Sequence, residues 1–149
     1  MRFGRSPLWG SLLVAGLCVG CGRGGPDIAR VEGTITLDGK PLPNAAVVFI
    51  PENGRPAGGR TDSDGKYVLT FSEGRKGALL GKAKVRVTTQ SDPSETADGT
   101  PIPAQKEVVP VEYNTQTTLE FNVESGKTNV ANFDLKSGGQ LPAADTYSQ

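Results

Sequence analysis

Residues 60–71 read RTDSDGKYVLTF, and this stretch decides the fold class. Asp62 to Gly65 is a tight-turn sequence, because an Asp side chain accepts backbone N–H groups further along the turn and Gly adopts a positive φ at no steric cost. Apolar and polar residues alternate after the turn, and the residues expected to face inward are Tyr67, Leu69 and Phe71. Alternation with period two is typical of a strand with one buried face. The stretch therefore predicts a hairpin in a β-protein.

The same alternation recurs on both sides of this hairpin. It predicts strands at residues 29–37, 82–88, 118–124 and 130–135. The apolar β-branched run AVVFI at residues 46–50 predicts a central strand buried on both faces, and residues 51–59 are expected to be a loop. The predicted inward set is Val31, Ile35, Leu37, Val47, Phe49, Tyr67, Leu69, Phe71, Val85, Val87, Leu119, Phe121, Val123, Phe133 and Leu135.

Two stretches lack periodicity. Residues 90–106 (QSDPSETADGTPIPAQK) are rich in Pro, Ser, Thr and acids, and this length exceeds that of ordinary connections. We expect a mobile or functional loop there, whose prolines resist pairing into a sheet. The polar residues 137–149 are predicted to be a disordered tail.

Composition excludes several classes of protein. The chain has 149 residues, with 16 Lys plus Arg against 16 Asp plus Glu and no His. Zero net charge argues against a nucleic-acid partner. The missing His removes the commonest general base and the commonest metal ligand, so we expect no catalytic residue, no metal and no cofactor. Seven or so short strands with turn signals between them predict an all-β antiparallel sandwich in a single domain.

The N-terminus has the features of an export signal. Arg2 and Arg5 precede the uncharged run at residues 8–19, which is too short to span a bilayer as a helix but has the length of a signal-peptide core. The sequence VGCG that follows resembles a bacterial lipoprotein signal, with Gly20 and Cys21 at its last two positions and Cys18 where Leu is usual. This resemblance implies lipidation of Cys21. A plain secretory signal is the alternative, and it leaves Cys21 as a lone exported thiol.

These features define the expected layout. Residues 1–20 are the signal peptide, residues 21–28 the lipidated Cys and a flexible tether, residues 29–136 the β-sandwich and residues 137–149 the tail. The protein is expected to be exported and anchored by its N-terminal lipid to a membrane of the cell envelope, at the outer membrane or the periplasmic face.

Four motifs resemble those of carboxypeptidase regulatory-like domains. They are VEGTI at residues 31–35, GKPLPNA at residues 39–45, TDSDGKY at residues 61–67 and VEYN at residues 111–114. The resemblance implies a transthyretin-like, prealbumin-type Greek-key β-sandwich of seven or so strands. It also implies a structural module, or one that binds protein or carbohydrate. The family has no common catalytic residue.

Within the third motif, Asp62, Asp64, Gly65 and Tyr67 are interpreted as a structural turn. The alternative is half of a calcium loop completed by Glu73, but Lys66 and Tyr67 occupy the positions where an oxygen ligand and a Gly are needed.

A row of cations on the strand at residues 82–88 consists of Lys82, Lys84 and Arg86. We interpret it as a solvated face opposed by Glu120 and Glu124, because its interleaved residues belong to the core.

Two functions of different class follow. The first is a non-enzymatic, lipid-anchored envelope module that is structural or binds protein or carbohydrate. The second is an envelope hydrolase or ligand-processing accessory protein that uses the loop carboxylates Asp92, Glu95 and Asp98.

Overall fold

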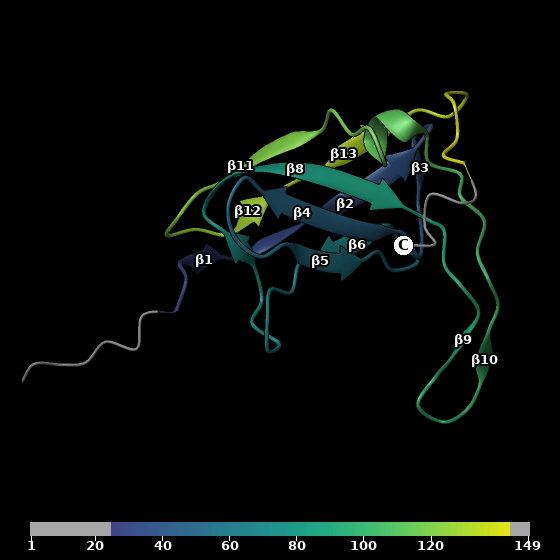
Figure 1. Cartoon of the computed structure of the whole chain (residues 1–149), viewed down its shortest axis with the longest axis horizontal. Coiled ribbons are helices and arrows are strands. Elements are labelled where there is room, and N and C mark those ends of the chain that lie inside the picture. The colour runs from purple at the N-terminus through teal and green to yellow at the C-terminus, as the bar shows by residue number, and fades with distance from the viewer. Residues whose placement is uncertain (1–24, 144–149) are drawn as a thin grey trace, which may run out of the picture.

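The computed structural model of the chain describes residues 25–143. These residues form an almost entirely β structure, in which two main sheets pack with the hydrophobic core between them (Figure 1). The all-β prediction is therefore confirmed. Cys21 and the residues assigned to the signal peptide lie outside the described residues.

The first sheet has four antiparallel strands in the order β11-β8-β4-β5. Its strands are β11 (Glu120–Val123), β8 (Gly81–Thr88), β4 (Ala46–Pro51) and β5 (Ala57–Arg60). The predicted alternation of the cationic strand is observed in β8, where Ala83, Val85 and Val87 are buried and face the core.

The second sheet is built around β2 and has five strands. Its strands are β2 (Val31–Leu37), β3 (Lys40–Pro41), β6 (Lys66–Val68), β12 (Asn129–Val130) and β13 (Phe133–Leu135). β12 and β13 run parallel to β2, so the expectation of a purely antiparallel structure was wrong. Parallel pairing needs a crossover, and the chain supplies one by passing through β11 of the first sheet.

The core contains most of the predicted inward set. Ile35, Val47, Phe49, Leu69 and Leu135 are at most 1% exposed. The predicted residues that are only half-buried are Leu37, Phe71, Leu119, Phe121 and Phe133. Core residues that the pattern did not predict are mostly small or follow loops: Leu42, Ala45, Ala57, Ala78 and Val109.

Two local expectations on the first sheet are corrected. β4 is buried on one face only, with Val47 and Phe49 in the core and Ile50 37% exposed, because no layer formed by residues 25–143 covers the outer face of this sheet. The expected loop at residues 51–59 includes the start of β5, where Gly58 and Gly59 pair with β4. A Cβ on Gly59 would lie 2.6 Å from the Val68 carbonyl oxygen, so Gly permits the close approach of β6.

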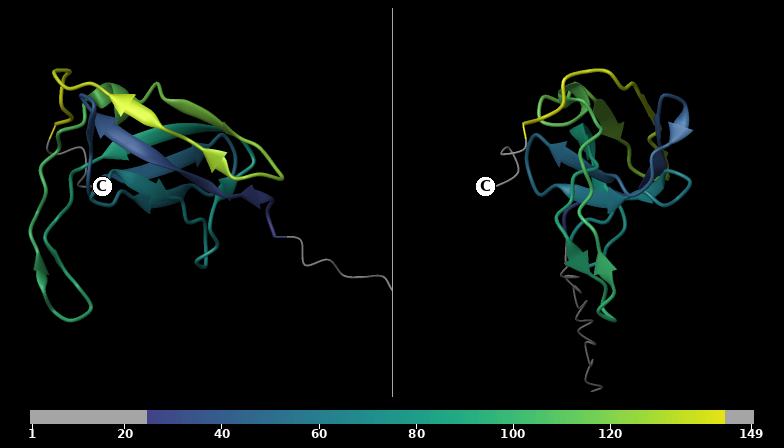
Figure 2. Two further views of the ribbon diagram at one scale, coloured as in Figure 1. Left: turned by 180° about the vertical axis from the view of Figure 1, so that it is seen from behind. Right: turned by 90° about the vertical axis from the view of Figure 1, so that its right-hand side faces the viewer.

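Residues 90–106 form a projecting hairpin, which we call the arm (Figures 1 and 2). Its strands are β9 (Ser94–Glu95) and β10 (Pro101–Ile102), and Ser91 and Gln105 pair at its base. The expectation that its prolines would resist pairing was wrong at Pro101. The Thr96 amide donates to the Thr100 carbonyl, and in an antiparallel ribbon hydrogen-bonded pairs alternate with pairs that exchange no hydrogen bond. The next pair, Pro101 with Glu95, is therefore of the second kind. The backbone nitrogen of Pro101 points to the outer side of the ribbon, where no N–H is needed.

The chain ends are partly ordered against this body. β1 (Ile28–Ala29) pairs with β7 (Ala78–Leu79) at the end of the domain away from the arm (Figure 1). The predicted disorder of the tail is wrong for its first part, because the Ser137 amide donates to Asp38 and the Gln140 carbonyl accepts from Val111.

The described residues contain one short 3₁₀ helix, η1 (Val111–Tyr113), between the arm and β11. No helix within residues 25–143 is long and apolar enough to cross a membrane.

Candidate functional site

Three segments of the second sheet meet at one buried point. Gly33 on β2 pairs with Tyr67 on β6, and the Tyr67 hydroxyl donates to the Ala131 carbonyl at 2.6 Å. A Cβ on Gly33 would lie 1.9 Å from that same carbonyl oxygen. Gly33 therefore permits the Ala131 peptide to approach β2, where it accepts the Tyr67 hydrogen bond. Two motifs that are separate in the sequence, VEGTI and TDSDGKY, form one structural unit here.

The turn that precedes Tyr67 is closed by its own side chain. Asp62 Oδ1 accepts from the Asp64 and Lys66 amides, both at 2.9 Å. Gly65 has φ +72°, and a Cβ there would lie 2.5 Å from the Ile35 carbonyl oxygen. Burial raises the pKa of Tyr67, whose hydroxyl lies inside the sandwich.

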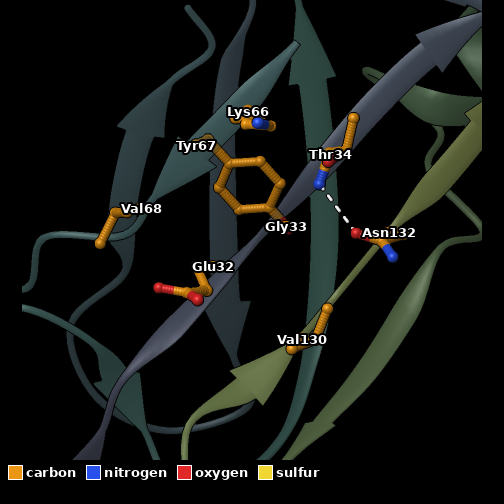
Figure 3. A pocket seen from close by; sticks show the side chains of 8 residues that line it. All are labelled: Glu32, Gly33, Thr34, Lys66, Tyr67, Val68, Val130 and Asn132. Atoms are coloured by element: carbon orange, nitrogen blue, oxygen red, sulfur yellow. Dashed lines mark hydrogen bonds between the residues drawn. The ribbon is translucent and has the colours of Figure 1, made fainter. Parts of the chain in front are cut away.

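A groove lies on the outer face of this sheet, above the Gly33–Tyr67 pair (Figure 3). It has a volume of about 400 Å³. β12 and β13 separate at Asn132, whose side-chain Oδ1 accepts from the Thr34 amide at 2.9 Å in place of a backbone carbonyl. The lining residues are Glu32, Gly33, Thr34, Lys66, Tyr67, Val68, Val130 and Asn132.

The groove combines polar and apolar contacts. Glu32 supplies a carboxylate that is ion-paired with Arg30 at 2.9 Å, and Lys66 supplies an exposed ammonium group. Val130 is 60% exposed and provides an apolar contact on the β12 side. A surface of this kind can hold a ligand by hydrogen bonds from a few polar groups and contact with apolar ones. It is an open groove rather than an enclosed cavity.

A second polar centre lies where β8 leaves the sheet toward the arm. The Glu107 carboxylate accepts hydrogen bonds from both sides of the arm base and from the segment after η1. Six groups donate to it: the Thr88 and Thr89 hydroxyls, the Thr89, Val108 and Val109 amides, and Asn114 Nδ2. This carboxylate joins the two strands that carry the arm to the body of the domain.

The electrostatics of Glu107 follow from these donors. Burial by itself would raise the pKa of Glu107, but the hydrogen bonds from Thr88, Thr89 and Val109 together lower it to about 2. Asn114 is 1% exposed and accepts from Arg86 Nε at 3.0 Å. The sequence did not predict this centre, because Glu107 and its donors come from three separate segments that share no local pattern.

The arm carboxylates are not brought together as a site. Asp98 accepts from the Thr96 hydroxyl in the turn at the tip, and this hydrogen bond lowers the pKa of Asp98. Glu95 lies on β9 and Asp92 lies near the base, beside Gln105 and Leu141. Within residues 25–143, no three Asp, Glu, His or Cys side chains gather as a metal-binding group.

The cationic row is partly paired. Lys82 Nζ lies 2.8 Å from Glu120 Oε2, as expected, and this hydrogen bond raises the pKa of Lys82. Glu124 does not oppose the row, because it pairs with Lys127 after the chain has turned away from β11. Arg86 belongs to the Asn114 centre rather than to a fully solvated face.

No family model and no curated protein sequence matches the chain. Among solved structures, the chain is similar to a 9R-lipoxygenase from Cyanothece PCC8801, with a TM-score of 0.41 and 18% sequence identity. The similarity covers 73% of this chain and 16% of the lipoxygenase chain. A likeness at this level carries no argument about function.

Proposed function

We propose that the protein is a non-enzymatic, lipid-anchored module of the cell envelope, with a transthyretin-like Greek-key sandwich that binds protein or carbohydrate. The observation that carries the proposal is the charged and apolar leader that ends in Gly20-Cys21, directly before a short tether and the β-domain. Two or more acyl chains on Cys21 make attachment stable, since each buried CH₂ contributes about 0.8 kcal/mol.

The arrangement of the domain supports this role. β1, the first described strand, and the arm lie at opposite ends of the long axis (Figures 1 and 2). A protein anchored through the segment before β1 would hold the arm on the side away from the membrane. The groove, with its carboxylate, ammonium and amide groups and the exposed Val130, lies along the body between the two ends.

The anchor is tested by two matched serine variants in the leader. Cys21→Ser deletes the acylated sulfur, so the protein should remain uncleaved or appear in the soluble fraction. Ala15→Ser, six residues upstream and outside the signal motif at residues 18–21, should leave processing and membrane attachment unchanged. Mass spectrometry of the mature protein should show a lipidated Cys21 at its N-terminus. An unmodified Cys21, or an N-terminus elsewhere, would overturn the anchor and the localisation.

Binding is tested with two aspartate variants on opposite faces. Val130→Asp places a charge in the groove, whereas Ile50→Asp places one at a site 37% exposed on the outer face of the other sheet. Glycan arrays and capture from envelope extract should give a ligand that is lost with Val130→Asp and retained with Ile50→Asp. Equal binding by both variants would exclude the groove. A hydrolytic activity on the extract that is lost on changing Asp92, Glu95 and Asp98 to Ala would favour the enzymatic alternative.

A further inference from the structure

The outer edge of β11 has unpaired backbone groups. The Val85 amide donates to the Leu119 carbonyl. In an antiparallel pair every second residue directs its backbone N–H and C=O toward the partner strand, so the backbone groups of Phe121 and Val123 point toward β8. The N–H and C=O of Glu120 and Asn122 therefore point away from the sheet. No residue within 25–143 donates to or accepts from these four groups.

This free edge has defined ends. The Thr118 amide donates to the Glu112 carbonyl on one side, and the Glu124 amide donates to Asn129 Oδ1 on the other. The free segment is thus centred on Phe121, with one outward-facing residue on each side of it. Exposed strand edges with free donors and acceptors are templates for pairing with another chain.

Apolar side chains lie next to this edge. Phe121 and Phe133 lie between β11 and β13 and are half-buried. Both rings pack on Phe49, with centroid distances of 5.8 Å for Phe121 and 6.5 Å for Phe133. The side chains of Phe121 and Phe133 therefore leave apolar surface next to the unpaired backbone. A strand added at β11 would cover part of this surface.

We infer that β11 pairs edge to edge with β11 of a second copy of this chain, in an antiparallel dimer with Phe121 on the two-fold axis. In this register Glu120 exchanges two backbone hydrogen bonds with the second copy's residue 122, and Asn122 does the same with its residue 120. All four outward groups of each copy are then paired. The contact is self-complementary, as a two-fold interface requires.

Side-chain chemistry fits the same register. Glu120 comes opposite an amide rather than a second carboxylate, so no like charges are directly opposed. The two Phe121 rings lie on the core side at a pair without backbone hydrogen bonds, where side chains approach most closely. Glu120 keeps its ion pair with Lys82 on the outer face.

The contact is small, and this determines how it must be measured. Two hydrogen-bonded pairs and one ring pair bury less than the roughly 1,200 Å² of a stable interface, so the dimer depends on concentration. Copies held on one membrane meet at a high effective concentration. The two-fold axis is normal to the sheet, so the two tethers leave from opposite ends. The seven residues at 21–27 reach up to about 25 Å, so both copies can anchor in one membrane when the dimer lies with a sheet face along it. The arms of the dimer then lie along the membrane, whereas a single anchored copy holds its arm away from it.

Disulfide trapping in membranes tests the register. The double variant Glu120→Cys with Asn122→Cys puts thiols opposite each other, within the 4.4–6.8 Å Cα separation that a disulfide takes. Mild oxidation of the full chain should give disulfide-linked dimers. In the single variant Glu120→Cys the new thiol lies opposite Asn122 of the second copy, so this variant should give no more dimer than the unmodified chain. The unmodified chain measures any cross-linking through Cys21. Equal yields from the single and double variants would overturn the proposal, independently of whether Cys21 is lipidated.

Proline at the edge gives a second test. Asn122→Pro removes an N–H that β8 does not use, so the fold should keep its circular dichroism and unfolding midpoint. The detergent-solubilised full chain should increase in mass with concentration in the unmodified protein and in Asn122→Ala, but stay monomeric in Asn122→Pro. A dimer that persists in Asn122→Pro, or a monomer at all concentrations, would refute pairing through β11.

Discussion

Replacing Glu107 by Gln should destabilise the domain by about 2–3 kcal/mol. The change keeps the shape of the side chain but turns one acceptor oxygen into a donor, which then faces amide and hydroxyl groups that donate already. Hydrogen bonds to a charged group contribute about 1.5–3 kcal/mol each, and a buried donor left unpaired costs about 1–3 kcal/mol. Local relaxation and the half-buried position of Glu107 reduce the sum of these two contributions to the expected loss of about 2–3 kcal/mol.

The effect should depend on pH in a defined direction. The pKa of Glu107 is lowered from 4.5 to about 2 in the folded protein. A carboxyl whose pKa is depressed by folding contributes stability that is fully present above the unfolded pKa and is lost as the pH falls through the folded one. The difference in unfolding free energy between the unmodified protein and Glu107→Gln should therefore be constant above pH 5 and shrink between pH 4.5 and 2.

Urea unfolding from pH 7 to pH 2.5, followed by circular dichroism, measures both effects. Near neutral pH the thermal midpoint should fall by roughly 4 °C for each kcal/mol lost in a domain of this size. Glu95→Gln is the matched control, because Glu95 lies exposed on the arm and should change stability by less than about 0.5 kcal/mol. A loss below about 1 kcal/mol for Glu107→Gln, or a difference that stays constant down to pH 2.5, would refute the assigned role.

Three further changes test the second sheet. Asp62→Ala should cost about 1–2 kcal/mol through the two lost amide hydrogen bonds, whereas Asp64→Ala should stay within about 0.5 kcal/mol, and chemical denaturation compares the pair. Gly33→Ala should cost about 3 kcal/mol or prevent folding, because its Cβ would overlap the Ala131 carbonyl; a melting temperature equal to that of the parent would contradict this close approach. Tyr67→Phe should cost about 1–2 kcal/mol by leaving that carbonyl unpaired, and an unchanged urea midpoint would show that the hydroxyl is dispensable.

Local patterns accounted for the strands and for the turn. The alternation in β8 and the Asp62–Gly65 turn depend on residues within a few positions of each other, so both were predictable from the sequence. The same reasoning failed for residues 90–106, because prolines were expected to exclude pairing. A ribbon with two open edges tolerates Pro wherever the nitrogen faces outward.

The sequence by itself determined the class of fold and most of the inward-facing residues. Only the tertiary structure decided which strands pair and which side chains converge. Thr34 and Asn132 are 98 residues apart, and the parallel pairing that joins them depends on the path of the chain through the other sheet. Glu107 likewise accepts hydrogen bonds from three segments, and the local alternation of apolar and polar residues does not predict contacts between distant segments. Periodicity records whether a residue faces the core, whereas its partners depend on how distant segments pack.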